Sequence, residues 1–385
     1  MRFAITEQQQ LVQDSALHWL RENYGFHQRA SGVHREGGHP QAWQAFAELG
    51  WLALPLAEDV GGLEGEALTV GLLAQALGAH LVVEPYVAQV ALALRALDRC
   101  ATPAQRAAWL PALVAGHERL AWAHAEPGDA TPFAPRACTA MRQGEGWMLR
   151  GMKQAVRGAG GAAHWLVSAS GGDGGPLLLR VPAGLPGVRV DAYETSDGAL
   201  AADLYFDTAW VPTESLVGEQ GASAALDEVL AFGMVAACWQ ATGTMQAALA
   251  QTRRYTADRQ QFGQALAQFQ VVQHRIAEMA VLCTEAQAAC ELAAMRLELA
   301  RGEVLHAVAA AVRSKVVRAA GFVARECVQL HGAMGVCEEL PIAASFRCLL
   351  AFEAEDGSAD THARWLGRHA LDSQRHTHSQ TLGEH

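Results

Sequence analysis

The stretch from Tyr255 to Gln273 carries residue types that could bind a flat, charged ligand. Arg259 offers a planar guanidinium that suits a phosphate or a carboxylate, and Phe262 can present a ring just before a glycine turn. Gln270 and Gln273 share one face of the following helix, so their amides could satisfy the edge of a heteroaromatic ring. A helix hairpin with a surface arginine and a core phenylalanine would have the same spacing, and spacing alone favours that simpler interpretation.

A second stretch with chemical potential runs from Gln329 to Pro341. Gly332 and Gly335 interrupt a long helical pattern there. A glycine loop lets backbone N–H groups approach a phosphate without interference from a Cβ atom. Because a glycine corner between two helices looks the same, this stretch by itself is weak evidence for a site.

The elements that must position these stretches divide the chain into helical, β and helical parts, which predicts an α+β fold. Residues 1–118 carry helical spacing, begin with a capping-box pattern at Thr6 and Gln9, and include an apolar helix over 67–79. Residues 119–221 contain strand-length apolar runs bounded by Gly, Pro or Asp, which predict a small β-barrel or a sandwich. Residues 222–372 predict a four-helix bundle, with helices over 233–254, 269–301 and 304–330 and a fourth from 341. The polar residues 373–385 are expected to form a disordered tail.

Composition excludes several classes of protein. A chain of 385 residues with 51% hydrophobic and 18% charged residues is not disordered. The net charge of −11 argues against nucleic acid or an anionic membrane as the main partner. We expect no membrane span and no signal peptide, because no long apolar run is present. The eight cysteines form no C-x-x-C pair, which indicates reduced thiols in a cytoplasmic protein and no metal site.

The two glycine-containing stretches together, in an α–β–α chain, resemble the acyl-CoA dehydrogenase family of flavoproteins. Residues 125–128 resemble the T-E-P-G segment of that family, and residues 151–153 resemble its G-x-K. Within the family, the chain looks most like the small subunit of pimeloyl-CoA dehydrogenase and related paired-subunit enzymes. The family's R-x-x-F-G turn, F-Q-x-x-Q helix start and Q-x-x-G-x-x-G loop match Arg259, Phe262, Gly263, Phe269, Gln270, Gln273, Gln329, Gly332 and Gly335.

The resemblance implies FAD-dependent α,β-dehydrogenation of an acyl-CoA thioester, as in fatty acid β-oxidation. A carboxylate removes the α-proton while a hydride passes from the β-carbon to flavin N5. The resemblance further implies a homotetramer, or a heterotetramer with a paralogous subunit, that passes electrons to an electron-transferring flavoprotein. FAD would lie between subunits: Arg259 and Phe262 would reach the FAD of a neighbouring subunit, and the Gly332 loop would hold the pyrophosphate and adenine half. The residues that the resemblance assigns to FAD are Trp122, His124, Ala125, Thr131, Val156, Arg157, Arg259, Phe262, Phe269, Gln270, Gln329, Gly332, Ala333, Ser358 and Asp360.

The base in many relatives is the Glu of an E-G-T or E-G-S segment, and the matching segment here places Asp356 in that position. Aspartate is one methylene shorter than glutamate, and a misplacement of about 1 Å can cost roughly 100-fold in rate. Glu353, Glu355 and Asp360 are local rivals, and Asp356 could instead be a helix-cap or loop carboxylate.

Two further departures keep other functions open. Ala125 stands where relatives usually have a threonine that donates to the flavin, and Arg157 is unusual beside the ring. The alternatives are therefore a non-catalytic or half-site subunit of a heterotetrameric acyl-CoA dehydrogenase, or another flavin oxidase chemistry on the same scaffold.

Overall fold

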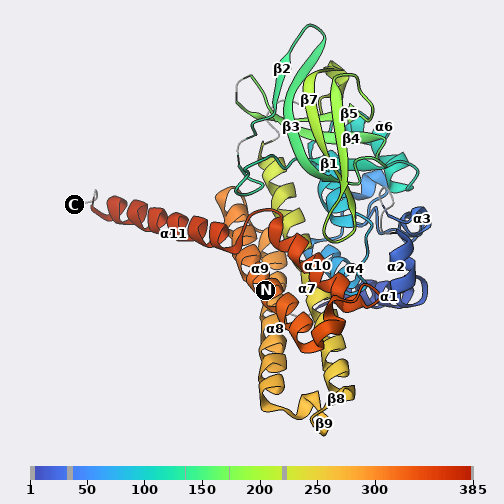
Figure 1. Ribbon diagram of the computed structural model, residues 1–385. Helices are drawn as coiled ribbons and strands as arrows, with labels where there is room; N and C mark the ends of the chain where they lie inside the picture. The colour runs from blue at the N-terminus through green and yellow to red at the C-terminus, as the bar shows by residue number, and fades with distance from the viewer. Residues whose placement is uncertain (1–4, 33–37, 135, 173, 219–222, 383–385) are drawn as a thin grey trace.

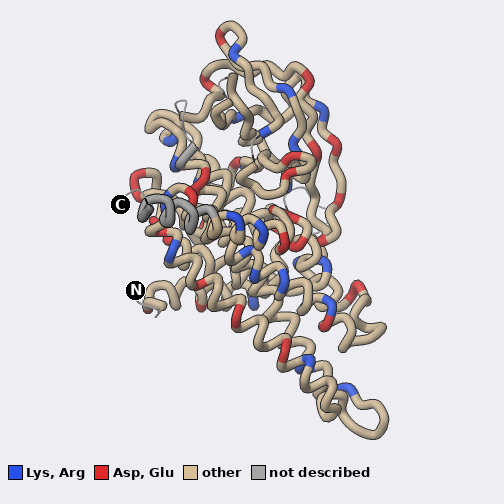
Figure 2. The backbone as a smooth tube through the Cα atoms, turned by 90° about the vertical axis from the view of Figure 1, so that its left-hand side faces the viewer, with Lys and Arg blue, Asp and Glu red and all other residues tan. Residues whose placement is uncertain are grey.

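The computed structural model describes residues 5–32, 38–134, 136–172, 174–218 and 223–382. A β domain lies above a set of long helices, and the N-terminal helices pack beside both (Figure 1). Acidic and basic residues are interspersed along the chain (Figure 2). None of the described helices is long and apolar enough to cross a membrane.

The N-terminal part is helical, as the sequence predicted. The capping box at Thr6 and Gln9 is confirmed, and the apolar helix over 67–79 has the predicted bounds. A π-helix, η2, runs over Val87–Leu94 and continues into α5. The elements are α1 (Glu7–Asn23), α2 (Phe26–Gly32), α3 (Pro40–Glu48), η1 (Glu58–Val60), α4 (Ala67–Ala79), η2 (Val87–Leu94), α5 (Arg95–Cys100) and α6 (Pro103–Val114).

The central part is one curled seven-stranded sheet with the order β1-β4-β2-β3-β7-β6, and β5 pairs with β4. Among the described residues, no pairing joins β6 to β1 or β5. The sheet is therefore curled but open, and it does not close into a barrel. The sequence missed the short strands β1 and β2. The strands are β1 (Leu120–Ala123), β2 (Thr139–Arg142), β3 (Gly146–Arg157), β4 (His164–Ser170), β5 (Pro176–Pro182), β6 (Val188–Glu194) and β7 (Leu200–Pro212), followed by η3 (Thr213–Ser215).

The C-terminal part contains the predicted long helices and one more. The expected disordered tail is contradicted as far as residue 382, because the backbone there continues the last helix; residues 383–385 lie outside the described residues. The elements are α7 (Ser223–Asp258), β8 (Gln260–Gln261), β9 (Gln264–Ala265), η4 (Leu266–Gln268), α8 (Gln270–Leu297), α9 (Glu303–His331), η5 (Gly332–Val336), α10 (Pro341–Ala354) and α11 (Ala359–Leu382).

The N-terminal helices and the bundle share one core. A Cβ atom at Gly78 of α4 would lie 1.9 Å from the carbonyl oxygen of Gln240, and one at Gly243 of α7 would lie 2.0 Å from that of Gln75. Only glycine permits this close approach of the two helix backbones. Helix α7 therefore packs closely on α4, and it also contacts α9.

Candidate active site

Strand β1 leads into two stacked rings. The centroids of Trp122 and His124 lie 5.3 Å apart with 17° between the planes, and both side chains are buried. Nε2 of His124 donates to the carbonyl oxygen of Pro132 at 2.7 Å, whereas Nδ1 is buried without a hydrogen-bond partner among the described residues. Burial, together with the charges of Arg136 and Lys153, holds the pKa of His124 well below its ordinary value. The ring is therefore neutral, and Nδ1 is an open acceptor.

Lys153 holds the segment that follows these rings. Its ammonium group is fully buried and donates to Glu126 at 2.5 Å, to the carbonyl oxygen of His124 at 3.0 Å and to Ser168 at 3.1 Å. Glu126 also accepts from the backbone N–H of Cys138 at 3.1 Å. Because all three donors of Lys153 are used inside the β domain, this residue orders the β1–β2 connection and does not face a ligand.

Arg157, at the end of β3, joins the β domain to the helices. Its Nε donates to Glu355 at 2.9 Å, and its Nη1 lies 3.0 Å from a carboxylate oxygen of Asp197 in the β6–β7 turn. Burial disfavours the charged guanidinium, but the two carboxylates outweigh burial and raise the pKa of Arg157. The preceding Val156 is buried in the core of the sheet. The end of β3 is thus fixed beside the residue that precedes Asp356.

Asp356 lies in the connection between α10 and α11, which we call the Asp356 loop (residues 355–358). Its backbone is left-handed, with φ of 50°, and its carbonyl oxygen accepts a hydrogen bond from Nε2 of His362 at 2.8 Å. Burial raises the pKa of the Asp356 carboxyl group; Arg313 opposes the rise, Glu355 adds to it and Arg157 opposes it. A half-buried carboxylate with a raised pKa is suited to proton transfer near neutral pH.

The Asp356 loop touches the β domain directly. A Cβ atom on Gly357 would lie 2.2 Å from the carbonyl oxygen of Ala130, so the two backbones are in close contact. Three residues further along the β1–β2 connection, Phe133 stacks on His306 of α9 with 3.9 Å between ring centroids. The half-buried Thr131 lies between these two contacts. The structure therefore brings Thr131 and Arg157 of the β domain to one interface with the Asp356 loop.

The remaining candidates near this interface have local partners. Ser358 accepts from the backbone N–H of Thr361 at 3.2 Å and so caps α11. Asp360 pairs with Arg318 at 2.9 Å on the surface. Ala125 is exposed, and its carbonyl oxygen accepts from the backbone N–H of Gln154. Their assignment to FAD stays a prediction.

The Arg259 stretch forms a protruding hairpin, labelled β8 and β9 at the lower end of the helices in Figure 1. Phe262 is 90% exposed, and its ring meets Phe269 edge-on at 6.2 Å. Arg259 and Gln270 are exposed as well, whereas the amide of Gln273 donates to a carbonyl within the hairpin. The charged and aromatic groups of this motif thus point away from their own chain.

The glycine loop lies at the same end of the bundle. Tyr255 stacks on His331 with 4.3 Å between ring centroids and donates to its carbonyl oxygen at 3.3 Å. Gln329, Gly332 and Ala333, which surround His331, are exposed. Within one chain, Tyr255 and His331 thus join the two segments that carry these motifs; a meeting of the motifs of different subunits around one FAD stays a prediction.

The two groups of candidates are well separated within the chain. Arg313 lies beside the Asp356 loop, and His331 lies about 18 residues further along α9, which is about 27 Å at 1.5 Å per residue. A ligand that contacts both groups of one chain must therefore be long. A shorter ligand could contact both kinds of group only if a different chain supplies each.

The residues present are compatible with FAD. Trp122 and the neutral His124 form a buried aromatic pair, and Nδ1 of His124 is an acceptor without a partner among the described residues. At the other end, Arg259 and Phe262 offer a charge and a ring, and the Gly332 loop offers unobstructed backbone for a pyrophosphate. These are the features that an isoalloxazine ring and a dinucleotide require.

Sequence reasoning missed the residues that hold the Asp356 loop. Arg313 is fully buried and donates to the carbonyl oxygens of Phe352 and Glu355, and His362 is also buried. A signal for Arg313 was present, because it is a charged residue between Val312 and Val316 on the apolar face of a helical pattern.

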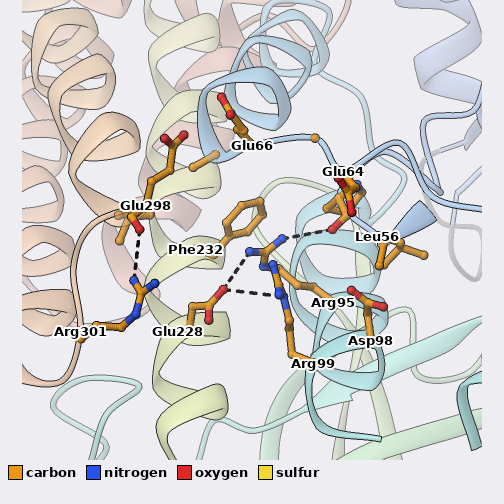
Figure 3. A pocket seen from close by; sticks show the side chains of 15 residues that line it. Leu56, Glu64, Glu66, Arg95, Asp98, Arg99, Glu228, Phe232, Glu298 and Arg301 are labelled. Atoms are coloured by element: carbon orange, nitrogen blue, oxygen red, sulfur yellow. Dashed lines mark hydrogen bonds and ion pairs between the residues drawn. The ribbon is translucent and has the colours of Figure 1, made fainter. Parts of the chain in front are cut away.

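A cavity of about 400 Å³ lies away from these residues, between α5, α7, the end of α8 and the segment 55–67 (Figure 3). Arg95 stacks on Phe232 and pairs with Glu228 at 3.0 Å across it. At its edge Glu298 lies close to Glu66, and burial followed by this like charge raises the pKa of Glu298. Its walls include none of the predicted site residues, so the cavity is separate from the candidate active site.

The chain is similar to proteins of one known family. Family models for the acyl-CoA dehydrogenase N-terminal and C-terminal domains match residues 6–117 and 219–371. The mitochondrial short-chain specific acyl-CoA dehydrogenase of Homo sapiens is 26% identical over 337 residues, which cover 85% of this chain and 81% of that protein. The acryloyl-CoA reductase (NADH) of Anaerotignum propionicum is 26% identical, with 96% of each protein covered.

Solved structures show the same fold. A variant of the Tcur3481-Tcur3483 steroid ACAD is 27% identical, with a TM-score of 0.87 over 96% of this chain and 99% of that chain. The ChsE4-ChsE5 complex from Mycobacterium tuberculosis is 25% identical, with the same TM-score and coverage. Together with the two family models, these matches show that the chain belongs to the acyl-CoA dehydrogenase family of flavin-dependent oxidoreductases.

Proposed function

We propose that the chain is a catalytic subunit of an FAD-dependent acyl-CoA dehydrogenase in which Asp356 removes the α-proton of an acyl-CoA thioester. The observation that carries this proposal is the placement of a half-buried carboxylate, with a raised pKa, on a loop fixed between the β domain and the helices. The nucleotide-binding candidates point outward from the same chain, as a ligand shared between subunits would require.

The residues of this chain have separate proposed roles in the reaction. The ionised carboxylate of Asp356 accepts the α-proton and becomes a neutral acid, a change that its buried setting favours. Trp122 and His124 would hold the ring end of FAD, and Arg259 with Phe262 would hold the nucleotide end of a neighbour's FAD. Bound FAD would supply the acceptor for the hydride that leaves the β-carbon.

The proposed setting is a tetramer in the cytoplasm, built from one kind of subunit or from two paralogous kinds. Its partners would be an acyl-CoA and an electron-transferring flavoprotein. All eight cysteines are free, and those at 138, 238, 283, 290 and 327 are buried, which suits a reducing compartment.

An anaerobic reduction assay tests the proposal. The purified protein should retain FAD, and a panel of acyl-CoAs should bleach its flavin absorbance. Asp356→Asn should slow bleaching by at least about 100-fold and keep its FAD, because the amide cannot accept the proton. Glu353→Gln is the matched control, since Glu353 is a nearby carboxylate on α10 and should bleach at the parent rate. Bleaching by Asp356→Asn at the parent rate would exclude Asp356 as the base, and hydrogen peroxide release in air would indicate oxidase chemistry.

A second candidate function is a half-site subunit, and the ion pair between Arg157 and Glu355 favours it. A guanidinium held beside the Asp356 loop occupies the segment that the resemblance assigns to one side of the flavin ring. In that case the lone chain would hold no FAD, and FAD would be retained with a paralogous subunit. Arg157→Thr should then let the lone chain take up FAD that the parent chain does not bind, whereas in the first candidate it should leave the FAD stoichiometry unchanged.

A further inference from the structure

A buried arginine lies directly behind the Asp356 loop. Arg313 sits in the first half of α9 with none of its surface exposed. Its Nη2 donates to the carbonyl oxygens of Phe352 and Glu355 at 2.5 Å each, and its guanidinium carbon lies 3.8 Å from the centre of the Phe352 ring. One nitrogen thus satisfies two of the carbonyl groups at the carboxyl end of α10, which is the end from which Asp356 emerges.

The rest of this guanidinium is also buried. Nε and Nη1 of Arg313 have no oxygen or nitrogen partner within the part of the chain that the structure describes, and the neighbouring group on α7 is the thiol of Cys238. A buried charge of this kind is costly unless an opposite charge lies nearby. The arginine is not explained by helix capping alone, because capping uses only Nη2.

The groups around Arg313 identify its counter-charge. Glu355 is bonded to Arg157, and burial raises the pKa of the Cys238 thiol of α7 to about 12, so this thiol is neutral. His362 of α11 is held neutral too, because burial and then Arg313 lower its pKa. Asp356 directly follows Glu355, whose carbonyl oxygen Arg313 binds, and the charge of Arg313 opposes the rise that burial causes in the pKa of Asp356.

We propose that Arg313 is a positioning residue for Asp356: its bonds to the carbonyl oxygens of Phe352 and Glu355 fix the end of α10, and they place a buried positive charge beside the Asp356 loop. The inference rests on the proposed function of Asp356 as the base. Of the charges that act on Asp356, Arg313 opposes the effect of burial most strongly. Without it, burial and the neighbouring Glu355 would leave Asp356 protonated to a higher pH, and a protonated acid cannot take the α-proton.

Three substitutions separate charge from packing. Arg313→Met removes the charge and keeps most of the volume, and Arg313→Lys keeps a charge that can still donate to the α10 carbonyls. Arg325→Met, at an exposed arginine of the same helix, is the matched control. Each variant is combined with Asp356→Asn, so that the difference spectrum isolates one carboxyl group.

The first measurement is the titration of Asp356 in the protein without FAD, followed by its infrared or carbon NMR signal. Arg313→Met should raise the titration midpoint by about one pH unit or more, because it removes the nearest opposing charge. Arg313→Lys and Arg325→Met should leave the midpoint near that of the parent. The second measurement is amide hydrogen exchange over residues 353–358, which should be about tenfold faster in Arg313→Met and unchanged in Arg325→Met.

An unchanged Asp356 midpoint in folded Arg313→Met would overturn the proposal. If Arg313→Met does not fold, Arg313→Gln takes its place, since an amide can donate to one carbonyl without a charge; an unchanged midpoint there is equally decisive. These titrations use no substrate, so a parent protein that fails to reduce flavin would refute the proposed function and leave the role of Arg313 open to the same measurement. Where the parent is active, the acid limb of its rate profile should move upward in Arg313→Met by the same shift as the midpoint.

Discussion

Nε2 of His362, near the start of α11, donates to the carbonyl oxygen of Asp356 across the turn that joins α10 to α11. The imidazole is almost completely buried, and burial lowers its pKa. The Asp356 loop is therefore held from both sides, by His362 on α11 and by Arg313 on α9. A left-handed residue that would otherwise be poorly populated is fixed by bonds to its backbone neighbours.

The buried histidine predicts a pH dependence of stability. The pKa of His362 is lowered in the folded chain, so the unfolded chain takes up the proton first, near its ordinary value of about 6.5. The free energy of unfolding should therefore fall as pH drops from 7 toward 5. His362→Gln should reduce this slope, as urea titrations at several pH values would show. A His362→Gln variant that loses the same stability at every pH would contradict the assignment.

The buried ion pair between Lys153 and Glu126 predicts a large loss of stability when one partner is removed. Lys153→Met leaves Glu126 buried with its charge uncompensated, which should cost about 3–5 kcal/mol in urea unfolding. The exposed pair of Lys315 and Glu285 is the matched control, and Lys315→Met should cost less than about 1 kcal/mol. Replacing Glu126 by Gln in the Lys153→Met background should recover part of the loss. Equal costs for Lys153→Met and Lys315→Met would show that burial of the pair does not matter.

Local patterns explain how much of the fold could be predicted. The helix over Ala67–Ala79 was predicted with its final bounds, because its apolar run is ended clearly on both sides. Strand β1 was missed, because its four residues gain their pairing only from β4, more than 40 residues away. The helical backbone after Ser373 was missed because a polar segment carries no core signal.

Candidate site residues could be named from the sequence where a motif is local and not where the partners are distant. Phe262 and Gly332 stand out from spacing within one stretch. The meeting of Arg157 with Glu355 joins residues 198 positions apart, and no local pattern specifies it. Arg313 could have been noticed as a charge on an apolar helix face, but its target, the end of α10, follows only from the packing of α9 on α10.

The contact of Gly357 with the β domain predicts strong sensitivity to a methyl group. Gly357→Ala would meet the carbonyl oxygen of Ala130 at 2.2 Å and would also strain a backbone with φ of 91°. Gly61→Ala is the matched control, since Gly61 has φ of 80° and open space around it. The control should cost about 1–2 kcal/mol of stability from backbone strain alone, and Gly357→Ala should cost more. Equal costs would mean that the Asp356 loop is free to move away from the β domain.

The outward direction of Arg259 predicts that it serves a site on another subunit. Arg259→Ala should weaken FAD retention by about tenfold or more, because a charged donor to a phosphate is lost. It should leave the unfolding of the apo chain unchanged, since Arg259 is exposed. Arg254→Ala, at an exposed arginine near the end of α7, should keep its FAD. Equal flavin content of the two variants after gel filtration would remove Arg259 from the site.

Assemblies that mix two variants test whether one site takes residues from two chains. Chains with Arg259→Ala keep Asp356, and chains with Asp356→Asn keep Arg259, so each lacks what the other has. If Arg259 of one chain completes the site of its neighbour, refolding the two variants together should restore flavin reduction in those pairs where an intact Asp356 meets an intact Arg259. If both residues serve the same chain's site, no pairing can combine them and the mixture should stay as inactive as its parts. The separation of about 27 Å along α9 between the two groups leads us to expect restoration.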